Sequence, residues 1–139
     1  MTIRREEIQL DTRGETQVID ITDPVREILR RGGIAEGVAH LFVPGSTAGL
    51  TTIEHEQGCL EDLAAALERV APRHEHYEHN KRWGDGNGFS HVRAALLGPS
   101  LSVPVAGGEL LIGTWQQIVL VDFDNRPRRR RVLVTVSGD

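Results

Sequence analysis

Residues 101–136, LSVPVAGGELLIGTWQQIVLVDFDNRPRRRRVLVTV, decide the fold of this chain. Apolar and β-branched residues dominate the stretch, in runs of strand length separated by glycine, asparagine and proline. Residues 106–108 predict one hairpin turn, and residues 124–127 predict a second. The expected strands are Leu101–Val105, Glu109–Ile112, Gln116–Phe123 and Arg128–Val136. This end of the chain therefore predicts an antiparallel sheet.

The N-terminal half adds more strands and a helix. Residues 3–10 and Thr16–Thr22 alternate, and Arg13-Gly14 between them predicts an opening hairpin. Asp23 followed by proline is typical of a helix N-cap, and Gly32-Gly33 should end that helix. Further strands are expected at Gly37–Val43 and at Leu50–Ile53, the latter ending at Glu54.

Helical spacing of apolar residues appears only in the middle of the chain. Leu60, Leu63 and Leu67 share one face of a helix that begins near Cys59 and stops at Pro72. A short helix is expected at Ser90–Leu97. Two to three helices among strands predict an α+β domain with a mostly antiparallel sheet, and 139 residues suit a single domain over residues 1–139.

Bulk composition excludes several classes of function. A net charge of −4 argues against a general nucleic-acid binder. One cysteine excludes an internal disulfide framework and a thiolate zinc cluster. No apolar run approaches the length of a membrane span, and the N-terminus lacks a signal-peptide core, so we expect a cytoplasmic protein with no membrane partner.

Residues 77–93, YEHNKRWGDGNGFSHVR, concentrate the unusual chemistry. His79 and His91 flank a loop rich in glycine and asparagine, and two neutral imidazoles plus a carboxylate are the usual minimum for a divalent metal site. Asp85 and Glu54 are the available carboxylates. The spacing of the histidines matches no standard zinc motif, so a solvated polar loop is the competing interpretation.

Other segments offer groups for a small ligand. Asn87 and Gly88 lie in a glycine-rich loop before a helix, where backbone N–H groups can capture an anion, although the loop lacks the lysine of a nucleotide-binding P-loop. Ser46 and Thr47 place two hydroxyls on a loop of small residues, and Trp115 with Gln116 could stack on and hydrogen-bond a ring. The basic run 128–131 should alternate between strand faces, so half of it is expected to pair with acids of another strand or subunit.

Four segments, FVPGSTAGLTTIE, YEHNKRWGDGNGFSHVRAALLGPSLSVPV, GGELLIGTWQQIVLVDFDNRPRRRR and VLVTVSG, resemble the YjbQ-like family, whose members are often labelled secondary thiamine-phosphate synthases. The resemblance covers nearly the whole chain. It implies a compact α+β domain, typically a homotrimer, with a polar site of histidines suited to a divalent metal such as zinc or magnesium.

The resemblance also implies roles for individual residues. His79 and His91 would be metal ligands, and His91, Asp85 and Glu54 the catalytic groups. The residues expected to bind substrate are Ser46, Thr47, Asn87, Gly88, Trp115 and Gln116. Many members carry a histidine-threonine pair where this chain has Gly45-Ser46, so one expected ligand is missing.

The labelled reaction of the family joins a pyrimidine-methyl diphosphate to a thiazole phosphate and releases pyrophosphate. The resemblance therefore implies a metal-dependent enzyme acting on a small phosphorylated or heterocyclic substrate. A non-catalytic trimeric module that binds a metal or ligand is the alternative, and a hydrolase using Ser46 or Thr47 is a weaker one.

Overall fold

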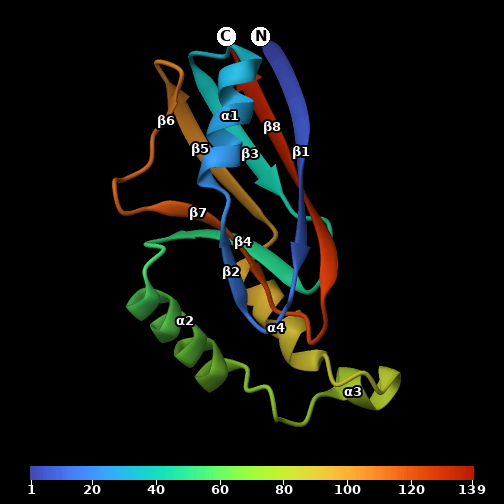
Figure 1. Ribbon diagram of the computed structural model, residues 1–139. Coiled ribbons are helices and arrows are strands. Elements are labelled where there is room, and N and C mark those ends of the chain that lie inside the picture. Colours follow the sequence, from blue (N-terminus) through green and yellow to red (C-terminus); the bar gives the residue numbers. More distant parts are fainter.

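The computed structural model describes residues 1–139 as two antiparallel sheets with four helices (Figure 1). The elements in chain order are β1 (Thr2–Thr12), β2 (Gln17–Asp20), α1 (Thr22–Gly32), β3 (Gly37–Phe42), β4 (Ala48–Ile53), α2 (Gln57–Val70), α3 (Glu78–Trp83), α4 (Gly88–Leu97), β5 (Ser100–Ala106), β6 (Glu109–Leu110), β7 (Gln117–Asp122) and β8 (Arg128–Gly138). The expected α+β class with mostly antiparallel sheets is confirmed.

Sheet pairing joins distant parts of the chain. The larger sheet has the order β1-β8-β3-β5-β6, and the smaller has the order β2-β7-β4. β1 pairs with β8 along its whole length, from Thr2 opposite Gly138 to Thr12 opposite Arg128. The predicted opening hairpin is therefore wrong, because β1 and β2 belong to different sheets. The hairpin predicted at residues 124–127 is wrong for the same reason, whereas β5 and β6 do pair around the turn at residues 106–108.

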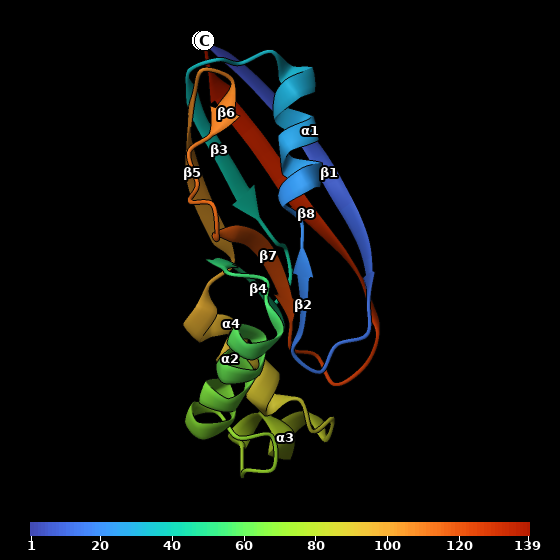
Figure 2. The same ribbon diagram turned by 60° about the vertical axis from the view of Figure 1, so that its left-hand side comes forward.

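The core lies between the larger sheet, α1 and the smaller sheet (Figure 2). Alternate residues of β8 and β3 point into it, as the period of two requires: Val132, Val134, Val136, Ala39 and Leu41 are at most barely exposed. Val25, Ile28 and Leu29 of α1 cover this face. The other face of the smaller sheet packs Val119 and Val121 against α4 and α2. β7 is consequently buried on both faces.

The helices begin at other residues than expected, because other side chains than expected bind the free amides at their N-termini. α1 begins at Thr22, whose amide donates to Asp20 Oδ1, so Asp23 is inside the helix and not its cap. The carboxylate of Glu56 accepts from the amides of Gly58 and Cys59, which begins α2 and ends the strand before residues 54–56. α4 begins at Gly88 after Asn87, two residues before the expected Ser90. The short helix α3 was not expected.

Gly14 holds the β1–β2 connection against the loop after β7. Its φ is +81°, and a Cβ there would lie 2.2 Å from the carbonyl oxygen of Asp124. Gly33, with φ +67°, has open space around the same position. Gly33→Ala should cost only the left-handed backbone penalty of about 1–2 kcal/mol. Gly14→Ala should cost clearly more, because backbone must also move. Urea unfolding of both variants measures the difference, and equal losses would contradict the close approach.

Candidate functional site

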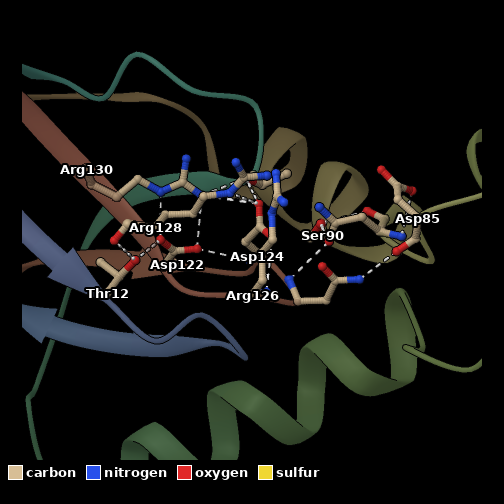
Figure 3. Close-up of polar contacts among 11 residues, drawn as sticks. Thr12, Asp85, Ser90, Asp122, Asp124, Arg126, Arg128 and Arg130 are labelled. Carbon is tan, nitrogen blue, oxygen red and sulfur yellow. Dashed lines mark hydrogen bonds and ion pairs between the residues drawn. The ribbon is translucent and has the colours of Figure 1, made fainter. Parts of the chain in front are cut away.

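A buried ion network closes the end of the molecule where β7 and β8 approach the loop after β3 (Figure 3). Asp122 is fully buried and accepts two hydrogen bonds from the Arg130 guanidinium, at 2.7 Å from Nε and 3.0 Å from Nη2. Thr12 of β1 donates to the same carboxylate at 2.6 Å. Arg130 also donates to Thr47 Oγ1 at 2.6 Å. The network ties both sheets to the loop that follows β3.

Asp124 is the second buried carboxylate of this network. Its Oδ2 accepts from Thr47 Oγ1 at 2.8 Å and from Arg128 Nε at 2.9 Å. Burial by itself would raise the pKa of Asp124, but the hydrogen bonds from Thr47, Arg128 and Asn87 outweigh it and hold the pKa below the ordinary value of 3.8. Asp124 therefore stays ionised at neutral pH.

The lowered pKa of Asp124 predicts acid sensitivity. A carboxylate whose pKa is depressed by folding stabilises the protein fully above its unfolded pKa, near 4, and the stabilisation is lost as the pH falls through the folded value. Asp124→Asn should be less stable than wild type at pH 7. The difference in unfolding free energy should shrink as the pH drops below 4. Denaturant unfolding at pH 7, 4 and 2.5 tests this, and a constant difference across the three would contradict it.

The network continues into the loop between α3 and α4. Asn87 is buried, and its Oδ1 accepts from Ser90 Oγ and from the amide of Asn125. The Asn125 side chain in turn donates to the backbone carbonyl of Asp85 at 2.8 Å. The loop that carries Asp85 is thereby anchored to the β7–β8 connection (Figure 3).

The two histidines predicted to act together do meet. The imidazole rings of His79 in α3 and His91 in α4 have centroids 4.2 Å apart at an angle of 41°. His79 Nδ1 lies 3.4 Å from Asp85 Oδ1. This nitrogen is shielded from solvent and makes no hydrogen bond, which is uncommon for a buried polar atom. Two imidazoles and a carboxylate therefore converge, with one nitrogen left without a partner.

His91 sits between this cluster and a cavity. Burial lowers the pKa of His91, the neighbouring His79 lowers it further, and the carboxylates of Asp85 and Asp124 oppose the shift. The neutral imidazole, the form that ligates metals, is therefore favoured. A cavity of about 260 Å³ opens beside it, lined by Gly45, Ser46, Ala48, His91, Ala94, Ala95 and Pro99.

Comparison with known proteins places the chain. A family model described as "UPF0047 protein YjbQ-like" matches residues 6–139. The chain belongs to the YjbQ family. A UPF0047 protein of Mycobacterium bovis is 40% identical over 132 residues, which cover 94% of this chain and 99% of that protein. A UPF0047 protein of Methanothermobacter thermautotrophicus is 38% identical over 138 residues, covering 99% and 94%.

Solved structures of YjbQ-like proteins share the fold. A YbjQ-like protein of unknown function from Sulfolobus solfataricus superimposes with a TM-score of 0.89 at 31% identity, covering 99% of this chain and 100% of the other. A YjbQ/UPF0047 protein from Clostridium acetobutylicum gives 0.86 at 34% identity, covering 95% and 99%. No helix of this YjbQ-family chain has the length and apolar character needed to cross a bilayer.

Most residues expected to bind substrate at this end of the YjbQ-family chain are already engaged within it. Thr47 is buried between Asp124 and Arg130. The Gly88 amide donates to Asn80 Oδ1, and the Asn87 amide donates to Asp85 Oδ1, so neither N–H is free for an anion. Ser46 is exposed at the cavity beside His91. Of these four residues, only Ser46 presents a side chain free for a ligand.

Glu54, Trp115 and Gln116 lie elsewhere in the chain. Glu54 follows the far end of β4, whereas Thr47 precedes its near end; Ala48 pairs with Asp122 and Ile53 with Gln117. Gln116 donates to Thr52 Oγ1 at 2.9 Å, which places the tryptophan loop beside Glu54. Within one chain, these three residues are therefore separated from His79 and His91 by the length of β4.

Glu54 has a different set of neighbours. Its carboxylate lies near Glu56 and Cys59, and ligand atoms of the three approach within 4.8 Å of one another. The Glu56 carboxylate is occupied as the cap of α2, and burial together with the Glu54 carboxylate raises the pKa of the Cys59 thiol. A raised thiol pKa weakens metal binding at neutral pH, because the metal must displace the proton. The histidine pair is the better candidate centre.

Sequence reasoning missed the buried carboxylates that support the site. Asp122 and Asp124 lie two apart and so face the same way at the end of an apolar strand, opposite the alternating arginines of β8. Asp124 was expected only as a turn residue. The pattern that could have identified them is the pair of acids at 122 and 124, which matches the pair of arginines at 130 and 128 in spacing. Half of the basic run was expected to pair with acids of another strand or subunit, and in the structure all four of its arginines pair with acids outside β8.

Proposed function

We propose that this protein is a divalent-metal-dependent enzyme acting on a small phosphorylated or heterocyclic substrate, with His79 and His91 as metal ligands. The observation that supports it is the pair of imidazoles 4.2 Å apart, with Asp85 beside one of them and a buried nitrogen without a partner. A buried, unpaired polar atom costs free energy, and such groups are retained where a ligand can satisfy them.

The donor set fits a metal ion. Imidazole and carboxylate together suit zinc, whereas magnesium prefers oxygen ligands alone, so we infer zinc from these residues. The metal would supply Lewis-acid stabilisation of a phosphoryl oxygen. His91, held neutral by its lowered pKa, would present a lone pair at the cavity wall. The Asp85 carboxylate, 3.4 Å from His79 Nδ1, would be the third ligand.

The cavity beside His91 is the proposed substrate position. Small side chains form most of its wall, and the exposed Ser46 hydroxyl can donate to an anionic oxygen there. Its volume of about 260 Å³ suits part of a small ligand, because drug-sized pockets begin near 300 Å³. Hydrogen bonds from Asn125 to Asn87 and to Asp85 hold the loop that connects the two histidines. These features support a reaction at a small phosphorylated group.

Thiamine-phosphate synthesis is the specific reaction we propose to test. It joins a pyrimidine-methyl diphosphate to a thiazole phosphate and releases pyrophosphate, so it requires stabilisation of the leaving diphosphate. His91 and Ser46 line the cavity where that charge would lie, beside the histidine pair that would hold the metal. Trp115 and Gln116 would hold a ring, and Glu54 would act as an acid or base, only if another copy of a homotrimer brought them to the cavity.

A non-catalytic trimeric module that binds a metal or ligand is the second candidate. It is favoured by the engagement of Thr47, Asn87 and Gly88 in internal hydrogen bonds, which leaves few free groups for catalysis. In that case chelation should lower stability or dissociate the assembly while no turnover is found.

Turnover with purified protein decides between the two. We expect pyrophosphate and thiamine phosphate to accumulate when both substrates and zinc are present, and to stop on chelation. His91→Ala should abolish turnover, while His40→Ala, an exposed histidine bonded to Ser102, should not change it. Zinc-loaded wild-type protein without turnover on these substrates would leave the binding module as the better description.

A further inference from the structure

The Arg130 guanidinium has one nitrogen that the buried ion network does not use (Figure 3). Its Nε and Nη2 donate to the Asp122 carboxylate, and Nη2 also donates to Thr47 Oγ1. No group of the chain accepts a hydrogen bond from Nη1. A guanidinium carries five N–H donors, and two of them belong to Nη1. The network therefore leaves two charged donors available.

Nη1 belongs to a buried side chain but is itself open to solvent. The Arg130 side chain is only 9% exposed. Within the chain, His79 Nδ1 is the one buried side-chain nitrogen or oxygen that is shielded from water and makes no hydrogen bond. Arg130 Nη1 also makes no hydrogen bond, so it is not shielded in this way and a ligand from solution can reach it. The bonds of Nε and Nη2 fix its orientation before a ligand arrives.

Glycine at position 45 leaves this nitrogen uncovered. A Cβ on Gly45 would lie 2.9 Å from Arg130 Nη1, closer than real Cβ atoms approach other atoms. A side chain there would cover Nη1 or displace the guanidinium from Asp122. Gly45 is exposed, so the space next to Nη1 is open to solvent.

The same space adjoins the cavity beside His91. Gly45 and Ser46 both line this cavity of about 260 Å³. The Ser46 side chain is exposed and makes no hydrogen bond within the chain, so its hydroxyl is a second free donor near Nη1. Charge-assisted N–H···O bonds from arginine are among the strongest that proteins make to phosphate oxygens. A guanidinium nitrogen and a hydroxyl at one cavity edge therefore suit a phosphoryl group.

We propose that Arg130 Nη1 and the Ser46 hydroxyl bind a phosphoryl group in the space that Gly45 leaves open. Arg130 then has a binding role besides its contacts with Asp122. Two arginines of β8 balance the two buried carboxylates of the network, so directed donors and not an excess of positive charge hold the anion. Free phosphate should therefore bind with millimolar affinity. That the phosphoryl group belongs to the substrate rests on the proposed function; the binding of phosphate does not.

An NMR titration of metal-free protein with inorganic phosphate tests the site. The backbone amide signals of Gly45 and Ser46 should shift and saturate in wild type. Gly45→Ala should weaken phosphate binding about tenfold or more, because its Cβ occupies the approach to Arg130 Nη1 and removes a charge-assisted hydrogen bond. Ser46→Ala should weaken it several-fold. Gly32→Ala is the matched control, since a Cβ there meets only the Arg4 side chain at an ordinary 3.5 Å, and it should bind phosphate like wild type.

Urea unfolding of each variant without phosphate shows that it is folded. Ser46 is exposed and outside the ion network, so Ser46→Ala tests the site even where Gly45→Ala lowers stability. A second cavity of about 280 Å³, which Gln9 and Arg131 help to line, offers phosphate another position. Shifts at Gln9 and Arg131 with none at Gly45 and Ser46, no binding by wild type, or unchanged binding in both variants would each overturn the proposal. No zinc is present, so protein that binds phosphate here but does not bind zinc would contradict the proposed function alone.

Discussion

Replacing Arg130 by alanine is expected to destabilise the protein by about 3–5 kcal/mol, because removal of one partner leaves a buried charge uncompensated. Asp122 has no exposed surface and receives two of its hydrogen bonds from this guanidinium. Thr47, which also accepts from Arg130, would lose a donor. Because native domains are stable by only about 5–15 kcal/mol, a loss of this size should lower the midpoint of urea unfolding strongly.

Arg129 provides the matched control on the same strand. It faces the opposite side of β8, and its ion pair with Asp11 at 3.3 Å is between side chains that are each about 80% exposed. Exposed pairs of this kind contribute about 0–1 kcal/mol. Arg129→Ala should therefore unfold almost like wild type. Similar urea midpoints for Arg129→Ala and Arg130→Ala would contradict the assignment of the network as a structural support of the site.

Removing either histidine of the pair is expected to weaken zinc binding on the order of 100-fold or more, since loss of even an outer-shell partner typically costs 10–100-fold. Both His79→Ala and His91→Ala should show it, with their unfolding free energy in metal-free buffer changed little. Neither side chain belongs to the hydrophobic core. Competition titration against a chromophoric chelator measures the affinity.

His40→Ala is the control for the zinc titration. This histidine is exposed on β3, and its Nδ1 lies 2.9 Å from Ser102 Oγ. It is far from His79 and His91 in the sequence and belongs to another element. Its loss should leave zinc affinity within error of wild type. If His40→Ala weakened zinc binding as much as His91→Ala does, binding would be diffuse and the pair would not be a site.

The positions of the strands followed from sequence, but their partners did not. Alternation and turn residues located β3, β4, β5 and β7 to within a few residues, because these signals are local. β8 pairs with β1 from the other end of the chain and not with β7 just before it. Nothing in the turn at residues 124–127 encodes that choice. Burial of the alternate valines Val132, Val134 and Val136 favours the observed pairing, and the ion pairs of β8 with Asp11 and Glu7 of β1 agree with it.

The candidate site, like the fold, was predicted only in part from the sequence. The glycine-rich loop between His79 and His91 indicated that the two rings could meet, and they do. The same reasoning grouped Glu54 and Trp115 with the two histidines. The sequence did not show that the length of β4 separates Glu54 from the end of the molecule where the histidines lie. Internal hydrogen bonds of Thr47 and Gly88 were equally invisible, since both residues look like free ligand-binding groups until their partners in the fold are known.

X-ray absorption at the zinc edge of the zinc-loaded protein tests the metal centre most directly. We expect a first shell containing two imidazole rings and oxygen ligands, with the imidazole scattering reduced in His79→Ala and in His91→Ala. Absence of bound zinc, or a shell containing the Cys59 sulfur with oxygen ligands and no imidazole, would contradict a metal centre at the His79–His91 pair and point to the Glu54–Glu56–Cys59 cluster in its place.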